Sequence, residues 1–320
     1  MNATYSNPLS IQKIGDPFIL KASDGRYYCY PTSAIDEGFK AWSSNDLINW
    51  TEEGFVYQKS KNKKAWGYKQ FWAPEVVERN GKFYMYYTAR WLEKDSLRIG
   101  VAVSDNPCGP FVDVYDGPLF DFHYAAIDAH VLLAEDGRSY LYYSRDCSEN
   151  KVNGRKESHI YAVELDSDMI TVRTEGQILL KPDQQWEFKS GADCRWNEGP
   201  FVIVNNGLYY LMYSANCYAH RDYSVGYAVS EHPLGPFRKY ADNPVLYSDH
   251  QDISGPGHHC VVESPDGQEL FIVYHTHTDP INGGGDRQLC LDRLSFREDG
   301  TIEVHGPTLT EQPVPSLTKC

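Results

Sequence analysis

GRYYCYPTS, at residues 25–33, is the first of five related phrases that decide the fold. The others are GKFYMYYTA (81–89), GRSYLYYSR (137–145), GLYYLMYSA (207–215) and GQELFIVYH (267–275). Each starts at a glycine that follows Asp or Asn and continues as an aromatic-rich segment, which is typical of a half-buried strand. Asp-Gly and Asn-Gly between apolar segments are strong hairpin signals. The sequence therefore predicts five β-hairpins.

The hairpins recur at long intervals. Their glycines, at positions 25, 81, 137, 207 and 267, lie 56, 56, 70 and 60 residues apart. Repeats of this length are typical of propeller blades rather than of helical solenoids. Each repeat supplies an apolar first strand, the Tyr-rich second strand and two further strands. We therefore predict an all-β, five-bladed β-propeller with four antiparallel strands per blade, as one domain over residues 1–320. A two-domain β-sandwich is the alternative.

The composition argues against several classes of partner and ligand. The chain has 30 Lys and Arg against 44 Asp and Glu, a net charge of -14. A nucleic-acid-binding surface needs clustered basic residues, so nucleic acid is not an expected partner. No segment is apolar enough to span a membrane, and no secretion signal begins the chain, which predicts a cytoplasmic protein unless a leader was removed. The 8 Cys include no CxxC pair, which argues against structural zinc, and their pairing cannot be deduced.

A candidate functional residue lies at the same sequence distance before each of the five hairpin glycines. The residues nine positions before the five glycines are Asp16, Trp72, Asp128, Glu198 and His258. If the repeats are equivalent, these residues begin the innermost strands and ring one mouth of the central channel. Two carboxylates facing each other across a pocket are the minimum for glycoside hydrolysis. The alternatives are a strand-cap carboxylate at Asp16 and a plain core residue at Trp72.

The expected placement assigns different tasks to three carboxylates. Asp16 and Glu198 face each other across the ring, and a separation of about 6.5–9.5 Å would leave room for a water molecule and predict inversion of configuration. Asp128 is expected beside Glu198, where a like charge raises the pKa of Glu198. A general acid must be protonated at the working pH, so Glu198 suits that task.

Five motifs then resemble one family. The resemblance is to glycoside hydrolase family 43, and it covers the chain from about Gly15 to the strand after Gly300. Three segments resemble its catalytic signatures: IGDPFIL (14–20), AIDAHVL (126–132) and WNEGPFVI (196–203). FWAPEV (71–76) and SGPGHH (254–259) resemble its two companion motifs. The resemblance implies an inverting five-bladed propeller in which Asp16 is the general base, Glu198 the general acid, and Asp128 tunes the acid and orients the sugar.

The resemblance also implies residues that bind the substrate. Trp72 would form the apolar wall of the sugar pocket, and Arg287 matches the family's substrate-binding arginine. His258 matches a histidine at the channel that lies near a calcium ion in many members. A hydrogen bond from His258 to the sugar or to a carboxylate is the alternative to metal binding. The chemistry requires no cofactor, and a structural calcium ion in the channel is an expectation.

We predict an inverting exo-glycosidase that removes terminal α-L-arabinofuranosyl residues from oligosaccharides of plant cell walls, such as those from arabinan and arabinoxylan. Long loops expected at 57–70, 145–157 and 215–223 favour a closed pocket over the open groove of an endo-acting enzyme. A β-D-xylosidase, or an enzyme with both activities, is the alternative within the family. A non-catalytic sugar-binding propeller is the alternative from another class, and the joint presence of Asp16 and Glu198 argues against it.

Overall fold

The computed structural model describes residues 3–189 and 193–317 of the chain. Its regular structure is almost all β, as the sequence predicts. In these two ranges the helical elements are two short 3₁₀ turns, η1 (Lys59–Lys61) and η2 (Gln185–Phe188). Neither approaches the length or apolarity that a membrane-spanning helix requires.

Most strands belong to five antiparallel sheets of four strands each. The first sheet comprises β2 (Gly15–Lys21), β3 (Tyr27–Thr32), β4 (Gly38–Ser44) and β5 (Thr51–Gln58). The second comprises β6 (Gly67–Arg79), β7 (Lys82–Trp91), β8 (Ser96–Ser104) and β9 (Val112–Asp113). The third comprises β10 (Ala126–Leu133), β11 (Ser139–Arg145), β14 (His159–Leu165) and β15 (Gln177–Leu180). The fourth comprises β17 (Asn197–Asn205), β18 (Leu208–Ala215), β19 (Ser224–Ser230) and β20 (Arg238–Lys239). The fifth comprises β21 (Gly257–Glu263), β22 (Leu270–His277), β23 (Arg287–Phe296) and β24 (Ile302–Val304).

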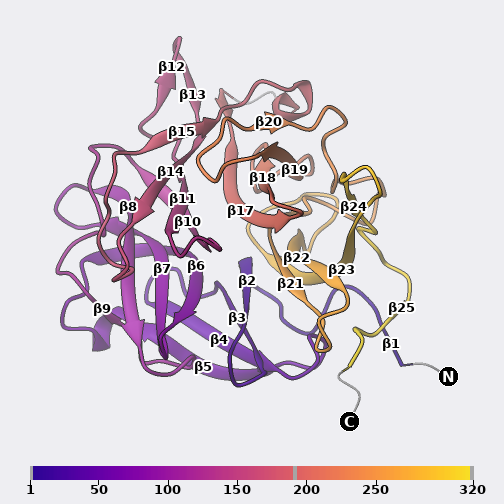
Figure 1. Ribbon diagram of the computed structural model, residues 1–320, viewed down its shortest axis with the longest axis horizontal. Helices are drawn as coiled ribbons and strands as arrows, with labels where there is room; N and C mark the ends of the chain where they lie inside the picture. Colours follow the sequence, from indigo (N-terminus) through magenta and orange to yellow (C-terminus); the bar gives the residue numbers. More distant parts are fainter. Residues whose placement is uncertain (1–2, 190–192, 318–320) are drawn as a thin grey trace.

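The first strands of the five sheets lie together at the centre of the molecule (Figure 1). Strand β6 packs between β2 and β10, β17 packs between β10 and β21, and β21 returns to β2. The two ends of the described chain also meet, because β1 (Thr4–Tyr5) pairs with β25 (Gln312–Pro313). Each of the five predicted hairpins is present as the first and second strand of one sheet.

Every first strand carries a β-bulge at the same place, where two of its residues oppose one residue of the second strand. The first bulge residue has a positive φ in all five sheets: Asp16 (50°), Ala73 (43°), Asp128 (57°), Gly199 (55°) and His258 (44°). A positive φ costs energy in a residue other than glycine, and such strain tends to persist where function requires it.

The bulges correct the predicted register. Asp16, Asp128 and His258 occupy one equivalent position, but Trp72 and Glu198 each lie one residue before it, so the prediction of five equivalent residues is wrong. The cause is the turn. In the second and fourth sheets Asn-Gly closes a two-residue turn, as between Arg79 and Lys82, whereas Asp-Gly in the other sheets lies in a longer loop. A fixed count from the glycine is therefore not a fixed place in the sheet.

Hydrogen bonds between neighbouring sheets repeat around the ring. At four of the five junctions, a side chain on the second strand of one sheet accepts the backbone N–H of the first bulge residue in the next sheet. Four junctions follow this pattern: Ala73 N–H to Thr32 Oγ1 (2.7 Å), Asp128 N–H to Thr88 Oγ1 (3.1 Å), His258 N–H to Ser214 Oγ (2.9 Å) and Asp16 N–H to His275 Nδ1 (3.1 Å). The last of these joins the fifth sheet to the first, so the pattern closes on itself.

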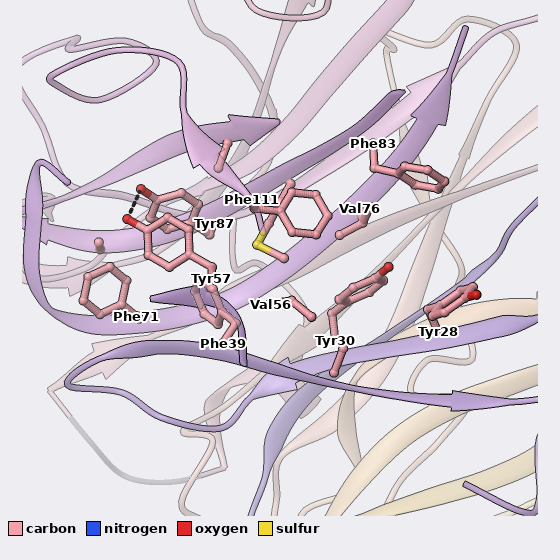
Figure 2. Close-up of a cluster of buried hydrophobic side chains, with 14 of the residues drawn as sticks. Tyr28, Tyr30, Phe39, Val56, Tyr57, Phe71, Val76, Phe83, Tyr87 and Phe111 are labelled. Atoms are coloured by element: carbon pink, nitrogen blue, oxygen red, sulfur yellow. Dashed lines mark hydrogen bonds between the residues drawn. The ribbon is translucent and has the colours of Figure 1, made fainter. Parts of the chain in front are cut away.

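The core fills the spaces between neighbouring sheets. Between the first and second sheets, Phe39, Tyr57, Phe71 and Tyr87 pack against one another (Figure 2). The hydroxyls of Tyr57 and Tyr87 lie 3.2 Å apart, and both donate to the buried carboxyl of Asp113. A buried tyrosine needs such a partner for its hydroxyl, which is how this Tyr-rich chain can use tyrosine as a core residue.

One small sheet stands apart from the five. It contains β12 (Lys151–Val152), β13 (Arg155–Glu157) and β16 (Cys194–Arg195), and it projects at the upper left of Figure 1. Part of the segment expected as a long loop at 145–157 is therefore this β12–β13 hairpin. The segment 57–70 likewise contains the end of β5, η1 and the start of β6.

Candidate functional site

The predicted carboxylates meet at the bulged ends of the first strands. Asp128, Glu198, His258 and Arg287 are all more than 90% buried there. Asp16 lies 3.4 Å from His258, and Gly199, the neighbour of Glu198, donates its N–H to Asp128 Oδ2 at 3.2 Å. Strands β2, β10, β17 and β21 thus bring residues far apart in the sequence into one cluster.

Asp16 is contacted by one guanidinium, one hydroxyl and two imidazoles. Arg287 Nη1 donates to Asp16 Oδ1 at 2.6 Å, and Thr32 Oγ1 donates to Asp16 Oδ2 at 2.7 Å. His258 and His275 place their Nδ1 atoms 3.4 and 3.7 Å from Asp16 Oδ1. Burial raises the pKa of Asp16, but Arg287 and the two histidines outweigh burial and hold that pKa well below its usual range. Asp16 is therefore ionised at neutral pH.

Glu198 has the opposite environment. Burial raises the pKa of Glu198 well above its usual range, and the charge of Asp128 raises it further. The Tyr223 hydroxyl donates to Glu198 Oε1 at 2.9 Å, which opposes this rise because the hydrogen bond favours the carboxylate. The Tyr223 ring is in turn held by stacking on His275, with ring centroids 5.6 Å apart and planes 8° apart. Glu198 therefore keeps its proton to a higher pH than an ordinary glutamate does.

Asp128 breaks the hydrogen-bond pattern between sheets. At the junction of the third and fourth sheets, Ser144 is the residue placed to accept the N–H of Gly199, but Asp128 Oδ2 accepts it and Ser144 Oγ is left without a partner. Burial and the charge of Asp16 raise the pKa of Asp128 well above its usual range. Asp128 is thus tied to the backbone beside Glu198, in agreement with its predicted place next to that residue.

Trp72 and Arg287 lie at the edge of this cluster. The Trp72 ring is half-buried and packs against Leu97 and Ile127, which leaves part of the ring accessible. The Arg287 guanidinium lies under the ring of Tyr218, 5.0 Å from its centroid, and the Tyr218 side chain is 46% exposed. An exposed tyrosine and an accessible indole are suited to contact a sugar ring.

His258 lies between a carboxylate and a guanidinium. Its Nδ1 is 3.4 Å from Asp16 Oδ1, and burial lowers the pKa of His258, as the positive charge of Arg287 also does. Calcium prefers several oxygen ligands. Within 3–189 and 193–317 no group of three or more His, Cys, Asp or Glu side chains is placed to hold a metal ion. The contact with Asp16 is consistent with the alternative interpretation of His258, an interaction with a carboxylate, and a calcium ion at His258 stays a prediction.

Sequence reasoning missed several contacts of the cluster. Thr32 bonds to Asp16 and Tyr223 bonds to Glu198, yet neither lies in one of the five segments that resemble the family motifs. His275 and His277 both lie on β22. His277 is an interior histidine that bonds to Ser254 and to the carbonyl of Tyr218, whereas His275 contacts the site by accepting the N–H of Asp16. The position of His275 opposite the bulge, equivalent to Thr32 in the first sheet, is the signal that could have identified it.

Comparison with known proteins now identifies the family. The family model described as glycosyl hydrolases family 43 matches residues 5–302. The chain therefore belongs to this family, which supports glycosidase activity and an oligosaccharide as the substrate. The resemblance inferred from the five motifs is confirmed.

Individual relatives are consistent with this assignment. The chain is 29% identical to the β-D-galactofuranosidase xynD of Aspergillus niger, over 94% of this chain and 85% of the relative. It is 27% identical to the arabinoxylan arabinofuranohydrolase of Paenibacillus polymyxa, over 94% of this chain but only 52% of that protein. The crystal structure of a thermostable family-43 glycoside hydrolase is 48% identical, with a TM-score of 0.94 over 98% of this chain and all of that one.

Proposed function

We propose that this protein is an inverting exo-glycosidase that hydrolyses terminal α-L-arabinofuranosyl residues. The observation that carries the proposal is the contrast between two buried carboxyls in one cluster. Asp16 is held ionised by Arg287, whereas burial and Asp128 keep Glu198 protonated. Two carboxyls whose pKa values are pushed apart are what a base and an acid require at one pH.

Each residue then has a defined task. Asp16 takes a proton from a water molecule, which attacks the anomeric carbon, and Glu198 gives its proton to the departing glycosidic oxygen. Asp128 keeps Glu198 protonated and orients the sugar, while Trp72 and Arg287 bind it. The water attacks from the face opposite the leaving group, so the configuration inverts. No step requires a metal ion or another cofactor.

The fold that supports this chemistry is proposed to be a five-bladed β-propeller over residues 1–320. The five four-stranded sheets would be its blades. The cyclic contacts of the first strands and the hydrogen bond from Asp16 to His275 support this, because they join the last sheet to the first. In such a ring Asp16 and Glu198 belong to different blades, so the packing of the blades sets the distance between the two carboxyls.

The furanoside preference is supported by two relatives. By their names, one is a galactofuranosidase and the other an arabinofuranohydrolase, so both act on five-membered sugar rings. β-D-Galactofuranose has the ring configuration of α-L-arabinofuranose, with a longer arm outside the ring. A site that accepts the common ring therefore explains both relatives. β-D-Xyloside hydrolysis is the second candidate, since another relative is described as a xylosidase/arabinosidase.

Three aryl glycosides test the proposal side by side: an α-L-arabinofuranoside, a β-D-galactofuranoside and a β-D-xyloside. We expect fastest hydrolysis of the arabinofuranoside, with β-L-arabinofuranose as the first anomer seen by proton NMR. Faster hydrolysis of the galactofuranoside or the xyloside would contradict the proposed substrate but not the proposed mechanism. A first product that retains configuration would refute Asp16 as the base. No turnover, with sugar binding intact, would indicate a sugar-binding protein.

A further inference from the structure

A buried pair, Glu75 and His130, lies directly behind the bulges, and the proposed reaction does not use it. Each is the residue that follows the bulge of its strand, Glu75 on β6 and His130 on β10. In the other three sheets this position is held by Phe18, Phe201 and Cys260. A carboxyl and an imidazole in such a place need partners, because an unpaired buried polar group costs free energy.

Both ring nitrogens of His130 have a partner. Its Nδ1 lies 2.8 Å from Glu75 Oε2, and its Nε2 accepts the backbone N–H of Val202 at 3.1 Å. Because Nε2 accepts, the proton of the neutral ring is on Nδ1, and this N–H donates to Glu75. The ring also packs on Phe201, with centroids 4.4 Å apart. Glu75 thus favours the one tautomer in which His130 can accept the N–H of Val202.

The bond from Val202 is one of two that attach β17 to side chains of β10. Asp128 Oδ2 accepts the N–H of Gly199 at 3.2 Å, and His130 Nε2 accepts the N–H of Val202. Glu198 is the residue directly before Gly199, so both bonds lie within four residues of the proposed acid. They therefore set the position of this segment of β17 relative to Asp128.

One other junction has the equivalent bond without the pair. Cys260 Sγ accepts the N–H of Ile19 at 3.3 Å, which attaches β2, the strand of Asp16, to β21. A thiol has no tautomers, so it needs no carboxyl to prepare it as an acceptor. The junction that carries the proposed acid therefore depends on a proton position, whereas the junction that carries the proposed base does not.

We propose that Glu75 and His130 are a positioning pair for the acid of the reaction. Glu75 sets the tautomer of His130, and His130 in that tautomer holds residues 199–202 so that Glu198 reaches the glycosidic oxygen. This inference rests on the proposed function, because it assigns the pair to the acid. With the proton on Nε2, two N–H donors would face each other at Val202, and this attachment of β17 to β10 would be lost.

The tautomer is tested without any substrate. In the full-length protein labelled with ¹⁵N-histidine, NMR at neutral pH distinguishes a protonated ring nitrogen from an unprotonated one. The imidazole signal that disappears in His130→Gln should come from a neutral ring with its proton on Nδ1. A proton on Nε2, or on both nitrogens, would overturn the pair. This result does not depend on the proposed function.

Kinetics tests the link to Glu198. His130→Phe keeps a ring against Phe201 but cannot accept the N–H of Val202. We expect kcat for a natural oligosaccharide to fall at least about tenfold, since displacement of a catalytic group by about 1 Å can cost about a hundredfold. An activated aryl glycoside needs less help from the acid and should lose much less. His130→Gln, whose Oε1 can accept the same N–H, should restore most of kcat.

Glu75 gives a second pair of variants, which serves if His130→Phe does not fold. Glu75→Leu removes the acceptor for Nδ1–H and should reproduce the uneven loss on the two substrates. Glu75→Gln keeps an oxygen that can accept this N–H and should lose less. Equal losses on the oligosaccharide and the aryl glycoside in folded His130→Phe and Glu75→Leu would overturn the positioning of the acid.

Cys260→Ala is the matched control, because it removes the equivalent bond beside Asp16. Both substrates need the base, so the ratio of their kcat values should stay at that of the unmodified enzyme. The same change of ratio in Cys260→Ala as in His130→Phe would overturn the specific link to Glu198. An unmodified enzyme that hydrolyses no glycoside would instead refute the proposed function, and the NMR result would still decide whether the pair exists.

Discussion

Asp16 and Glu198 are both buried carboxyls beside a bulge on a first strand, yet their surroundings differ in sign. Around Asp16 lie Arg287 and two histidines, whereas around Glu198 lie Asp128 and a single hydroxyl donor, that of Tyr223. Burial alone raises the pKa of either carboxyl. The comparison shows that the neighbouring sheets decide which carboxyl remains ionised.

Asp16 and Glu198 also differ in their backbone position relative to the bulge. Asp16 sits on the bulge residue itself, with a φ of 50°, and its N–H is taken by His275. Glu198 precedes the bulge, and glycine occupies the positive-φ position after it. The backbone strain is therefore carried by the residue proposed as the base in one sheet, and by Gly199 in the other.

The largest expected effect comes from Asp16→Asn. The amide keeps the size of the side chain but cannot accept a proton from water, so kcat should fall about 10³–10⁴-fold, toward the upper end for a general base. The loss should be equal for substrates with good and poor leaving groups, because both need an activated water. Steady-state kinetics on two aryl glycosides checks this, with circular dichroism to confirm folding. Near-normal turnover would remove Asp16 from the mechanism.

Glu198→Gln should instead separate substrates by their leaving groups. Gln cannot donate a proton, so kcat for a natural oligosaccharide should fall about 10³-fold, while an activated aryl glycoside that departs unaided should lose only about tenfold. Kinetics on the two substrates gives the ratio. Equal losses on both substrates, the result expected for Asp16→Asn, would contradict the role of Glu198 as the acid.

Asp128→Asn removes the neighbouring carboxyl whose ionisation raises the pKa of Glu198, so that pKa falls. The alkaline limb of the pH–rate profile should then move to lower pH, and kcat at neutral pH should fall about 10–100-fold. Asp146→Asn is the matched control, since Asp146 acts on Glu198 in the same direction but more weakly. A profile that does not move in Asp128→Asn would show that Asp128 does not tune the acid.

The same substitution should alter stability. The pKa of Asp128 is raised in the folded protein, so the unfolded chain releases this proton at lower pH than the folded chain does. Stability is therefore lost as pH rises above about 4, the pKa of an unperturbed aspartate. Asn does not titrate, so the variant should lose less stability between pH 4 and pH 7. Thermal unfolding at both pH values measures this, and an unchanged difference in Tm would contradict it.

The smallest effect is expected from Tyr223→Phe. Loss of the hydroxyl removes a hydrogen bond that favours ionised Glu198, so the pKa of Glu198 should rise and the alkaline limb should move to higher pH, opposite to Asp128→Asn. We expect kcat to change only about 2–10-fold, the range for one hydrogen bond. Tyr213→Phe in the same sheet, whose hydroxyl bonds to Glu187, is the control. A shift in the same direction as Asp128→Asn would contradict the assignment.

Much of the fold was accessible from local sequence. Asp-Gly and Asn-Gly turns followed by alternating aromatic residues predicted all five hairpins, because turn chemistry and strand periodicity act over a few residues. The family motifs also identified Asp16, Asp128 and Glu198 as one cluster. The assumed equivalence of all five ring residues failed because Asn-Gly closes a two-residue turn whereas Asp-Gly lies in a longer loop, which shifts the bulge by one residue relative to the glycine.

The sequence by itself determined the hairpins, the family and which carboxyls are the candidates for catalysis. Tertiary structure alone decided their surroundings. Arg287 reaches Asp16 from 271 residues away, and Tyr223 reaches Glu198 from the second neighbour in its sheet. Such contacts depend on how sheets pack around the centre, and no local pattern encodes them, because electrostatic and hydrogen-bonding neighbours are set by distance in space rather than along the chain.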